Sequence, residues 1–288
     1  MLSITTDYQS SQGNPYPYLR AIAEAGFTHI HWCHQWNTDF IYHPSEIDQI
    51  GRWLHELGLQ LLDTHGSEGK EKFWYAPEEY ARLAGVELVK NRIDFTAALG
   101  GDAVVMHAYP ATTDPALAQH NDYIFDQLRR SLDDLQPYAL ERGIKIALEN
   151  LIDFAGVRAG AVAAVDAIDN FDLILRVYEH YGPEYIGFCY DSGHAILGHS
   201  RMTRLAPLMS RLSVLHLNDN DGQGDLHLLP FAGAVDWELA AKLIADSPYD
   251  KPMSYEVSMN KMGIDDEAVY LQRAHTLGTQ FAQLVAAQ

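Results

Sequence analysis

Eight short apolar runs recur along the chain and alternate with longer segments of helical periodicity. The middle runs, such as AVVM and IKIAL, are almost continuously apolar, which is typical of strands buried on both faces. We therefore predict eight strands, at residues 2–5, 28–33, 59–64, 103–107, 145–149, 186–190, 212–217 and 253–257.

Helical patterns fill the intervals between these runs, at residues 17–26, 45–58, 77–100, 124–143, 171–182 and 235–246. Four of the patterns end in a glycine just before the next strand, as helices commonly do: Gly26, Gly58, Gly100 and Gly143. Asp236 is a predicted N-cap of the last pattern. Repeated strand–helix units predict one (β/α)8 TIM barrel, with a doubly wound open sheet as the alternative.

No break in composition and no Pro/Gly/Ser-rich linker divides the chain, so we expect a single domain over residues 1–288. The net charge of −19 disfavours a nucleic-acid partner, because binding to phosphates draws on Lys and Arg. The sequence shows no secretory leader and no apolar run of membrane-spanning length, and we expect a cytoplasmic protein without membrane contact. Cys33 and Cys189 lie in apolar runs and are predicted to be buried, reduced thiols.

Side chains that can bind metals stand at the ends of six predicted strands or shortly beyond them. The carboxyl ends of strands in a barrel face the same mouth, where such enzymes place their chemistry. Two long predicted loops, at 151–170 and 218–234, would cover that mouth. The candidate ligands, in chain order, are His65, His107, Glu149, Asp191, His194, His216, Asp225, His227 and Glu256.

Four of these residues close neighbouring predicted strands five to eight: Glu149, Asp191, His216 and Glu256. Three carboxylates and one imidazole suit a divalent ion such as Mn²⁺, Zn²⁺, Co²⁺ or Mg²⁺. A single acid after a strand is more often a helix cap or a surface charge. Glu149 and Glu256, however, stand at the end of or within apolar runs, and buried acids are rare unless they are paired or coordinating.

The chain resembles the xylose-isomerase-like TIM-barrel superfamily of sugar isomerases and epimerases. Glu149, Asp191 with Gly193 and His194, His216, and Glu256 match its motif. The resemblance implies that Glu149, Asp191, His216 and Glu256 bind one metal. It also implies that Glu149 and Glu256 act as the catalytic acid and base on opposite faces of a sugar.

The other five candidates match the remaining ligands of the endonuclease IV branch of this fold, which carries three zinc ions. The resemblance then implies three sites: His65, His107 and Glu149; Glu149, Asp191, His216 and Glu256; and His194, Asp225 and His227. The alternative is that His65, His107 and His194 contact the substrate, while Asp225 and His227 structure a loop. The expected number of ions is one, or up to three.

Two departures bear on the subfamily. Ketose 3-epimerases typically carry an Arg shortly after the seventh-strand His, where this chain has HLNDNDGQGD. The early loops here are rich in aromatic residues but not clearly basic, unlike those with which the endonucleases bend DNA. We expect His34, Trp36 and Tyr109 to contact the substrate, and His31 and His34 to face away from Cys33.

We therefore predict a divalent-metal-dependent isomerase or epimerase that acts on a sugar or keto-sugar through an enediolate. A sugar dehydratase or lyase results if the intermediate expels a β-hydroxyl. A metal-dependent phosphodiesterase of the endonuclease IV type is a further alternative, and so is a sugar sensor without catalysis. The expected partner is a small carbohydrate, and a homo-oligomer is compatible with the sequence.

Overall fold

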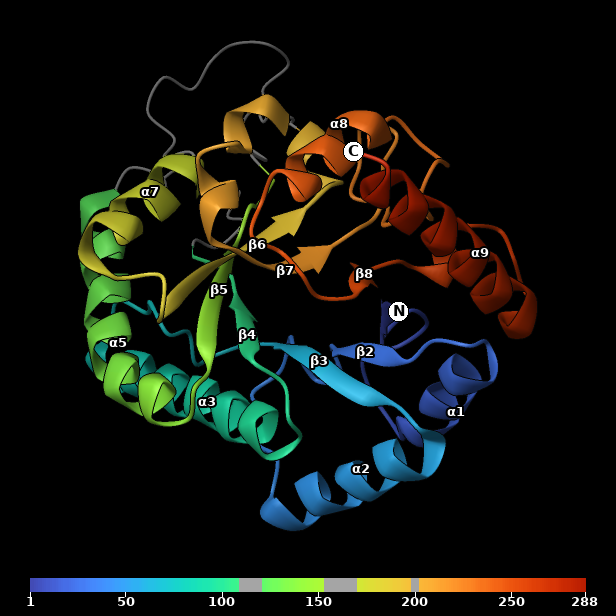
Figure 1. The fold of residues 1–288 in the computed structure, drawn as a ribbon. Coiled ribbons are helices and arrows are strands. Elements are labelled where there is room, and N and C mark those ends of the chain that lie inside the picture. Colours follow the sequence, from blue (N-terminus) through green and yellow to red (C-terminus); the bar gives the residue numbers. More distant parts are fainter. Residues whose placement is uncertain (109–120, 153–169, 198–201) are drawn as a thin grey trace.

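The computed structural model describes the chain except for residues 109–120, 153–169 and 198–201. Its centre is a ring of eight parallel strands in the order β7-β6-β5-β4-β3-β2-β1-β8 (Figure 1). The strands are β1 (Leu2–Thr5), β2 (His29–Trp32), β3 (Gln60–His65), β4 (Ala103–Met106), β5 (Lys145–Glu149), β6 (Ile186–Asp191), β7 (Leu212–His216) and β8 (Met253–Tyr255).

The ring closes between β7 and β8. There the described chain has one isolated parallel bridge, Leu217 with Tyr255, in place of a full ladder. The amide of Leu217 donates to the Ser254 carbonyl at 3.0 Å, and the Leu217 carbonyl accepts from the amide of Glu256 at 3.2 Å. An open sheet would leave these strands apart, so the barrel prediction is confirmed and the doubly wound alternative is wrong.

Helices lie outside the ring and cover the outer faces of the strands (Figure 1). The main apolar cluster joins helices and strands, for example Ile93 and Phe95 with Val104 and Met106. The helices are α1 (Tyr16–Glu24), α2 (Pro44–Leu57), α3 (Glu79–Ala98), α5 (Asn121–Glu141), α7 (Asn170–His180), α8 (Trp237–Ala245) and α9 (Glu267–Ala286). Short 3-10 segments are η1 (His194–Ile196), η2 (Met202–Leu205), η3 (Leu208–Arg211) and η4 (Met259–Lys261).

Local sequence accounts for where these elements begin and end. The four predicted terminal glycines adopt positive φ, 95° at Gly26, 68° at Gly58, 84° at Gly100 and 67° at Gly143. The Asp236 side chain accepts from the amide of Leu239 and caps α8, as predicted. Among the described helices, none combines the length and apolarity that a membrane crossing requires.

A second, smaller apolar cluster fills the ring from inside: Ala103, Val105, Ala147, Cys189 and Val214. Side chains two residues apart on a strand share a face, so the residue two places after an inward one also points inward. That step leads from Val105 to His107, from Ala147 to Glu149, from Cys189 to Asp191 and from Val214 to His216. The strand period therefore carries four of the predicted ligands to one mouth of the barrel.

Candidate metal centre at the barrel mouth

Glu149, Asp191, His216 and Glu256 lie together, with one ligand atom from each residue within 4.8 Å of the others. Nδ1 of His216 is 3.3 Å from Glu149 Oε2 and 3.1 Å from Glu256 Oε2. Glu149, Asp191 and His216 end their strands, and Glu256 directly follows β8. The structure thus brings together the four residues that the sequence analysis selected.

His65 and His107 form a second group with Glu149. Glu149 Oε2 lies 4.0 Å from His65 Nε2 and 3.3 Å from His107 Nε2. The second oxygen, Oε1, lies 3.2 Å from His194 Nδ1. The Glu149 carboxylate therefore stands between the histidines of several strands, as a bridging ligand would.

His194, Asp225 and His227 form a third group. Asp225 Oδ1 is 3.1 Å from His227 Nε2 and 3.6 Å from His194 Nε2. His227 has a φ of 49°, a left-handed conformation that is uncommon for residues other than glycine and often occurs at functional sites. All nine predicted ligands are thus found in three groups.

The loop that carries Asp225 and His227 is built by the residues NDND that precede it. Asp219 accepts hydrogen bonds from the amides of Gly233 and Val235 and from the Trp237 indole. Asn220 Oδ1 accepts from the amides of Leu226 and His227, at 2.6 and 3.1 Å. These hydrogen bonds fix the path of the loop back over the mouth and so position Asp225 and His227 there.

Four histidines have one ring nitrogen against a polar partner, a hydrogen-bonding backbone oxygen in three of them and the Glu68 carboxylate at His107, and the other nitrogen facing a carboxylate. The Nδ1 atoms of His65, His194 and His227 lie 2.9–3.0 Å from the backbone oxygens of Gly66, Asn150 and Glu256. Nδ1 of His107 lies 3.0 Å from Glu68 Oε1. When such a ring is neutral and Nδ1 carries the proton, its Nε2 lone pair faces an acidic oxygen, and a cation between the two would satisfy both. Such partners orient the histidine ligands of metal sites.

The donor set therefore fits divalent cations. Glu149 Oε2 and both ring nitrogens of His216 are buried without a hydrogen-bond partner in the described structure. Unpartnered buried acceptors are costly unless a cation or proton satisfies them. The clusters of buried His, Glu and Asp are consistent with a divalent metal site.

Charges in the cluster shift the pKa of its members. Burial raises the pKa of Asp191 to about 6, although the His194 charge opposes the shift. Burial alone would raise the pKa of Glu149 and Glu256, but the neighbouring His216 charge outweighs it and the net shift is downward. Burial lowers the pKa of His65 to about 3, which keeps this ring neutral.

Histidines beside carboxylates shift in the other direction. Burial disfavours protonation of His107, but Glu68 and Glu149 outweigh it and raise the pKa of His107 to about 10. Burial is likewise outweighed at His227, where Asp225 and Glu256 raise the pKa to about 10. These raised pKa values favour the protonated form of both rings beside their carboxylates.

Two asparagines fix the position of Asp191 through hydrogen bonds. The Asn150 side chain exchanges two hydrogen bonds with the backbone of Asp191, at 2.8 and 2.9 Å. Asn218 Nδ2 donates to Asp191 Oδ2 at 2.8 Å, while the amide of His194 donates to Oδ1 at 2.7 Å. A Cβ at Gly193 would overlap the Asn218 side chain, so glycine is required there.

Sequence reasoning missed Glu68 and Asp7, which also reach the mouth. Glu68 follows β3 in GSEGKEK, a loop whose charges look solvent-exposed. Asp7 follows β1 and accepts a hydrogen bond from the Thr5 hydroxyl. Burial raises the pKa of Asp7, and the Glu256 charge adds to the shift. The position of Asp7 just after a strand could have indicated a side chain at the mouth, whereas nothing in the sequence around Glu68 indicated this.

The three predicted substrate contacts differ in their surroundings. The Trp36 ring lies 4.6 Å from the His65 ring and 6.0 Å from the His107 ring, at the mouth. His34 is buried, with its ring nitrogens 3.1 Å from the Tyr42 hydroxyl and 2.7 Å from the Gly13 carbonyl oxygen. A substrate contact through His34 would require it to exchange one of these partners. Tyr109 lies outside the described residues.

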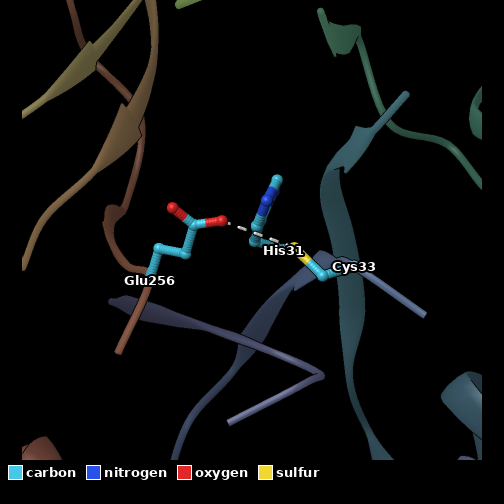
Figure 2. Close-up of side chains that lie close together, drawn as sticks. All are labelled: His31, Cys33 and Glu256. Carbon is cyan, nitrogen blue, oxygen red and sulfur yellow. Dashed lines mark hydrogen bonds between the residues drawn. The ribbon is translucent and has the colours of Figure 1, made fainter. Parts of the chain in front are cut away.

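The expected orientation of β2 was wrong in one respect. His31 and Cys33 do not face apart, because residues two apart in an extended segment share a face. The two side chains lie together in the barrel interior with Glu256 (Figure 2). Cys33 and Cys189 are both buried and unpaired, as predicted.

The family model described as xylose isomerase-like TIM barrel matches residues 19–277 of this chain. The uncharacterized protein y4fM of Sinorhizobium fredii is 32% identical over 287 residues, covering 93% of this chain and 88% of that protein. A probable endonuclease 4 of Mycobacterium ulcerans is 30% identical over 177 residues, covering 58% of this chain and 63% of that protein.

Among solved structures, a D-psicose 3-epimerase in the presence of D-fructose is similar with a TM-score of 0.76 and 15% identity, over 98% of both chains. A D-tagatose 3-epimerase-like protein has a TM-score of 0.74 and 17% identity, over 99% of this chain and 98% of that one. At these identities the similarity concerns the fold.

Proposed function

Because this chain belongs to the xylose isomerase-like TIM-barrel family, we propose that it is a divalent-metal-dependent isomerase or epimerase of a sugar or keto-sugar. One observation carries the proposal. Glu149 and Glu256 come from different strands and approach the same nitrogen of His216, with Asp191 in the same group. The proposal treats residues 1–288 as one catalytic domain that binds Mn²⁺, Zn²⁺, Co²⁺ or Mg²⁺ there.

Two carboxylates around one substrate position provide a base and an acid. A divalent ion at this centre would polarise a substrate carbonyl and its neighbouring hydroxyl. Glu149 or Glu256 then removes the proton from the adjacent carbon, and the opposite Glu or His194 returns a proton elsewhere. Isomerisation or epimerisation results, while loss of a β-hydroxyl would make the same residues a sugar dehydratase or lyase.

The comparisons support a sugar as the substrate class. The D-psicose 3-epimerase is described in the presence of D-fructose, and its similarity covers 98% of this chain. Trp36 beside His65 provides an aromatic wall at the mouth, a surface on which sugar rings pack well. The HLNDNDGQGD loop holds no Arg that could bind a ketose as in the 3-epimerases, so the proposal does not specify which carbon of the sugar exchanges its proton.

A metal-dependent phosphodiesterase is the second candidate. It is favoured by the two further ligand groups, His65 with His107 and His194 with Asp225 and His227, which would suit more than one ion. The similarity to a probable endonuclease 4 supports it over 58% of this chain. The net charge of −19 argues against DNA as its substrate.

Solvent exchange tests the primary proposal. Purified protein loaded with Mn²⁺ or Co²⁺ is incubated with a panel of ketoses and aldoses in D₂O, and deuterium at carbon is followed by NMR. We expect exchange with at least one sugar and a loss of about 10²-fold or more in Glu149→Gln and in Glu256→Gln. Retained turnover in both variants would refute the two-glutamate scheme.

An incision assay, read together with the exchange experiment, separates the second candidate from the first, and elemental analysis adds the number of ions. Elemental analysis gives the number of ions per chain, and an incision assay on abasic duplex DNA gives nuclease activity directly. Incision without carbon-bound exchange would replace the sugar proposal with the phosphodiesterase. Exchange without incision would support the isomerase or epimerase, whatever the number of ions.

A further inference from the structure

Beside the metal centre a second set of donor atoms converges. His31 and Cys33 come from the end of β2, and Glu256 comes from the end of β8. One ligand atom from each lies within 4.8 Å of the others (Figure 2). His31 and Cys33 are completely buried, so the group differs from the clusters of exposed polar side chains that are common on protein surfaces.

His31 has the hydrogen-bond arrangement of a metal ligand. Its Nδ1 is hydrogen-bonded to the carboxylate of Asp63, which is itself completely buried. Its Nε2 is buried and has no hydrogen-bond partner in the described structure. A carboxylate on one nitrogen and a free lone pair on the other is the arrangement that orients histidine ligands of zinc. A buried imidazole nitrogen without a partner is otherwise costly.

Glu256 directs its two oxygens to different places. Oε2 lies 3.1 Å from His216 Nδ1 and 3.7 Å from His227 Nδ1, toward the mouth centre. Oε1 lies 3.8 Å from the Cys33 sulfur, toward His31 and Cys33. One carboxylate can therefore contribute an oxygen to each of two neighbouring cations.

We propose that His31, Cys33 and Glu256 form a thiolate-containing site for a zinc-like divalent cation, beside the mouth centre and sharing Glu256 with it. Imidazole, thiolate and carboxylate are the donors that zinc takes in proteins, and a thiolate selects zinc over magnesium or calcium. Three protein donors leave one position of a tetrahedral ion for water or another ligand. The site does not depend on the reaction proposed for the mouth.

Cys189 provides a matched comparison within the same barrel. It is also completely buried and also groups with two possible ligands, Glu149 and His216. Both of those residues already belong to the mouth centre, so Cys189 brings no independent histidine with it. The proposal therefore assigns the sulfur ligand to Cys33 and excludes Cys189.

Cobalt provides a direct test, because a cobalt–thiolate bond absorbs strongly in the near ultraviolet and bonds to nitrogen and oxygen alone do not. Metal-free, full-length protein is titrated with Co²⁺ in the wild-type, Cys33→Ser and Cys189→Ser forms. We expect the charge-transfer band in wild type and Cys189→Ser and its loss in Cys33→Ser. The visible cobalt bands of the mouth groups, together with circular dichroism, confirm that Cys33→Ser is folded.

Zinc provides an independent readout. X-ray absorption of the zinc-loaded wild type should show a sulfur neighbour at about 2.3 Å, which Cys33→Ser lacks. Absence of sulfur ligation in wild type with the mouth loaded would overturn the proposal, as would a band that persists in Cys33→Ser or disappears only in Cys189→Ser. Failure of the sugar-exchange experiment leaves these outcomes unaffected, so the two proposals are tested separately.

Discussion

The Glu68 carboxylate lies 3.0 Å from Nδ1 of His107, on the opposite side of the ring from Glu149. His107 Nε2 is 3.3 Å from Glu149 Oε2, so Glu68 sets which nitrogen faces the centre. Glu68 is thus a positioning residue for a predicted metal ligand.

Glu68→Gln should weaken metal binding by about 10- to 100-fold, because the amide orients His107 less firmly and removes a charge. Titration of metal-free protein with Co²⁺ or Zn²⁺ measures the change. Glu71→Gln is the matched control, since Glu71 lies in the same loop with an exposed side chain. Equal metal affinity in the two variants would show that His107 needs no such partner.

Metal affinity should rise with pH across the neutral range. The pKa of His107 and of His227 is raised to about 10, so both rings carry a proton in the metal-free protein near neutral pH. A cation must displace these protons, and each one displaced makes the apparent affinity rise by about tenfold per pH unit. His65, with its pKa lowered to about 3, should release none.

Calorimetry in buffers of different ionisation enthalpy counts the protons released on metal binding. His107→Gln should reduce the count by about one, whereas His65→Gln should leave it unchanged. An affinity that does not vary with pH would show that the cluster binds its cations without proton displacement.

Gly193→Ala should destabilise the fold by about 1–3 kcal/mol and loosen the centre, because the added carbon would overlap the Asn218 side chain that holds Asp191. Denaturant unfolding and metal retention after dialysis measure the two effects. Gly224→Ala is the control, because its nearest neighbour is the Leu226 side chain at 3.7 Å, an ordinary contact. Similar stability of both variants would contradict the assigned role of Gly193.

Metal removal should lower the melting temperature. Cations that bind the folded chain alone stabilise it by about 2.7 kcal/mol at a hundredfold excess over the dissociation constant. Scanning calorimetry with and without a chelator measures the shift, and Glu149→Gln should lose most of it. An unchanged melting temperature in wild type would mean that the cluster binds no cation under those conditions.

Much of the fold could be predicted from the order of the segments. Short apolar runs located every strand to within two residues, and the runs in the middle of the chain are almost continuously apolar because those strands are buried on both faces. The nine candidate ligands could be chosen because strand ends converge in a barrel. The grouping of Glu149, Asp191, His216 and Glu256 followed from neighbouring strand ends. The two further groups came from a resemblance, since spacing along the chain does not show which loop folds back.

The omissions have physical causes as well. Glu68 reads as a loop charge, and only the tertiary fold brings it to His107. Asn150 and Asn218 act on Asp191 through backbone and side-chain hydrogen bonds that no periodicity marks. The pairing of His31 with Cys33 was within reach, because a period of two residues places both on the inner face.

The junction between β7 and β8 connects the candidate metal centre to the folding of the barrel. Among the described strands β8 comes last in the sequence, and one isolated bridge, Leu217 with Tyr255, joins it to β7. His216 ends one side of this junction and Glu256 follows the other. A cation bound by both would link the two sides of this junction. It could be captured only after β8 has docked beside β7, so metal uptake would report that the barrel has closed.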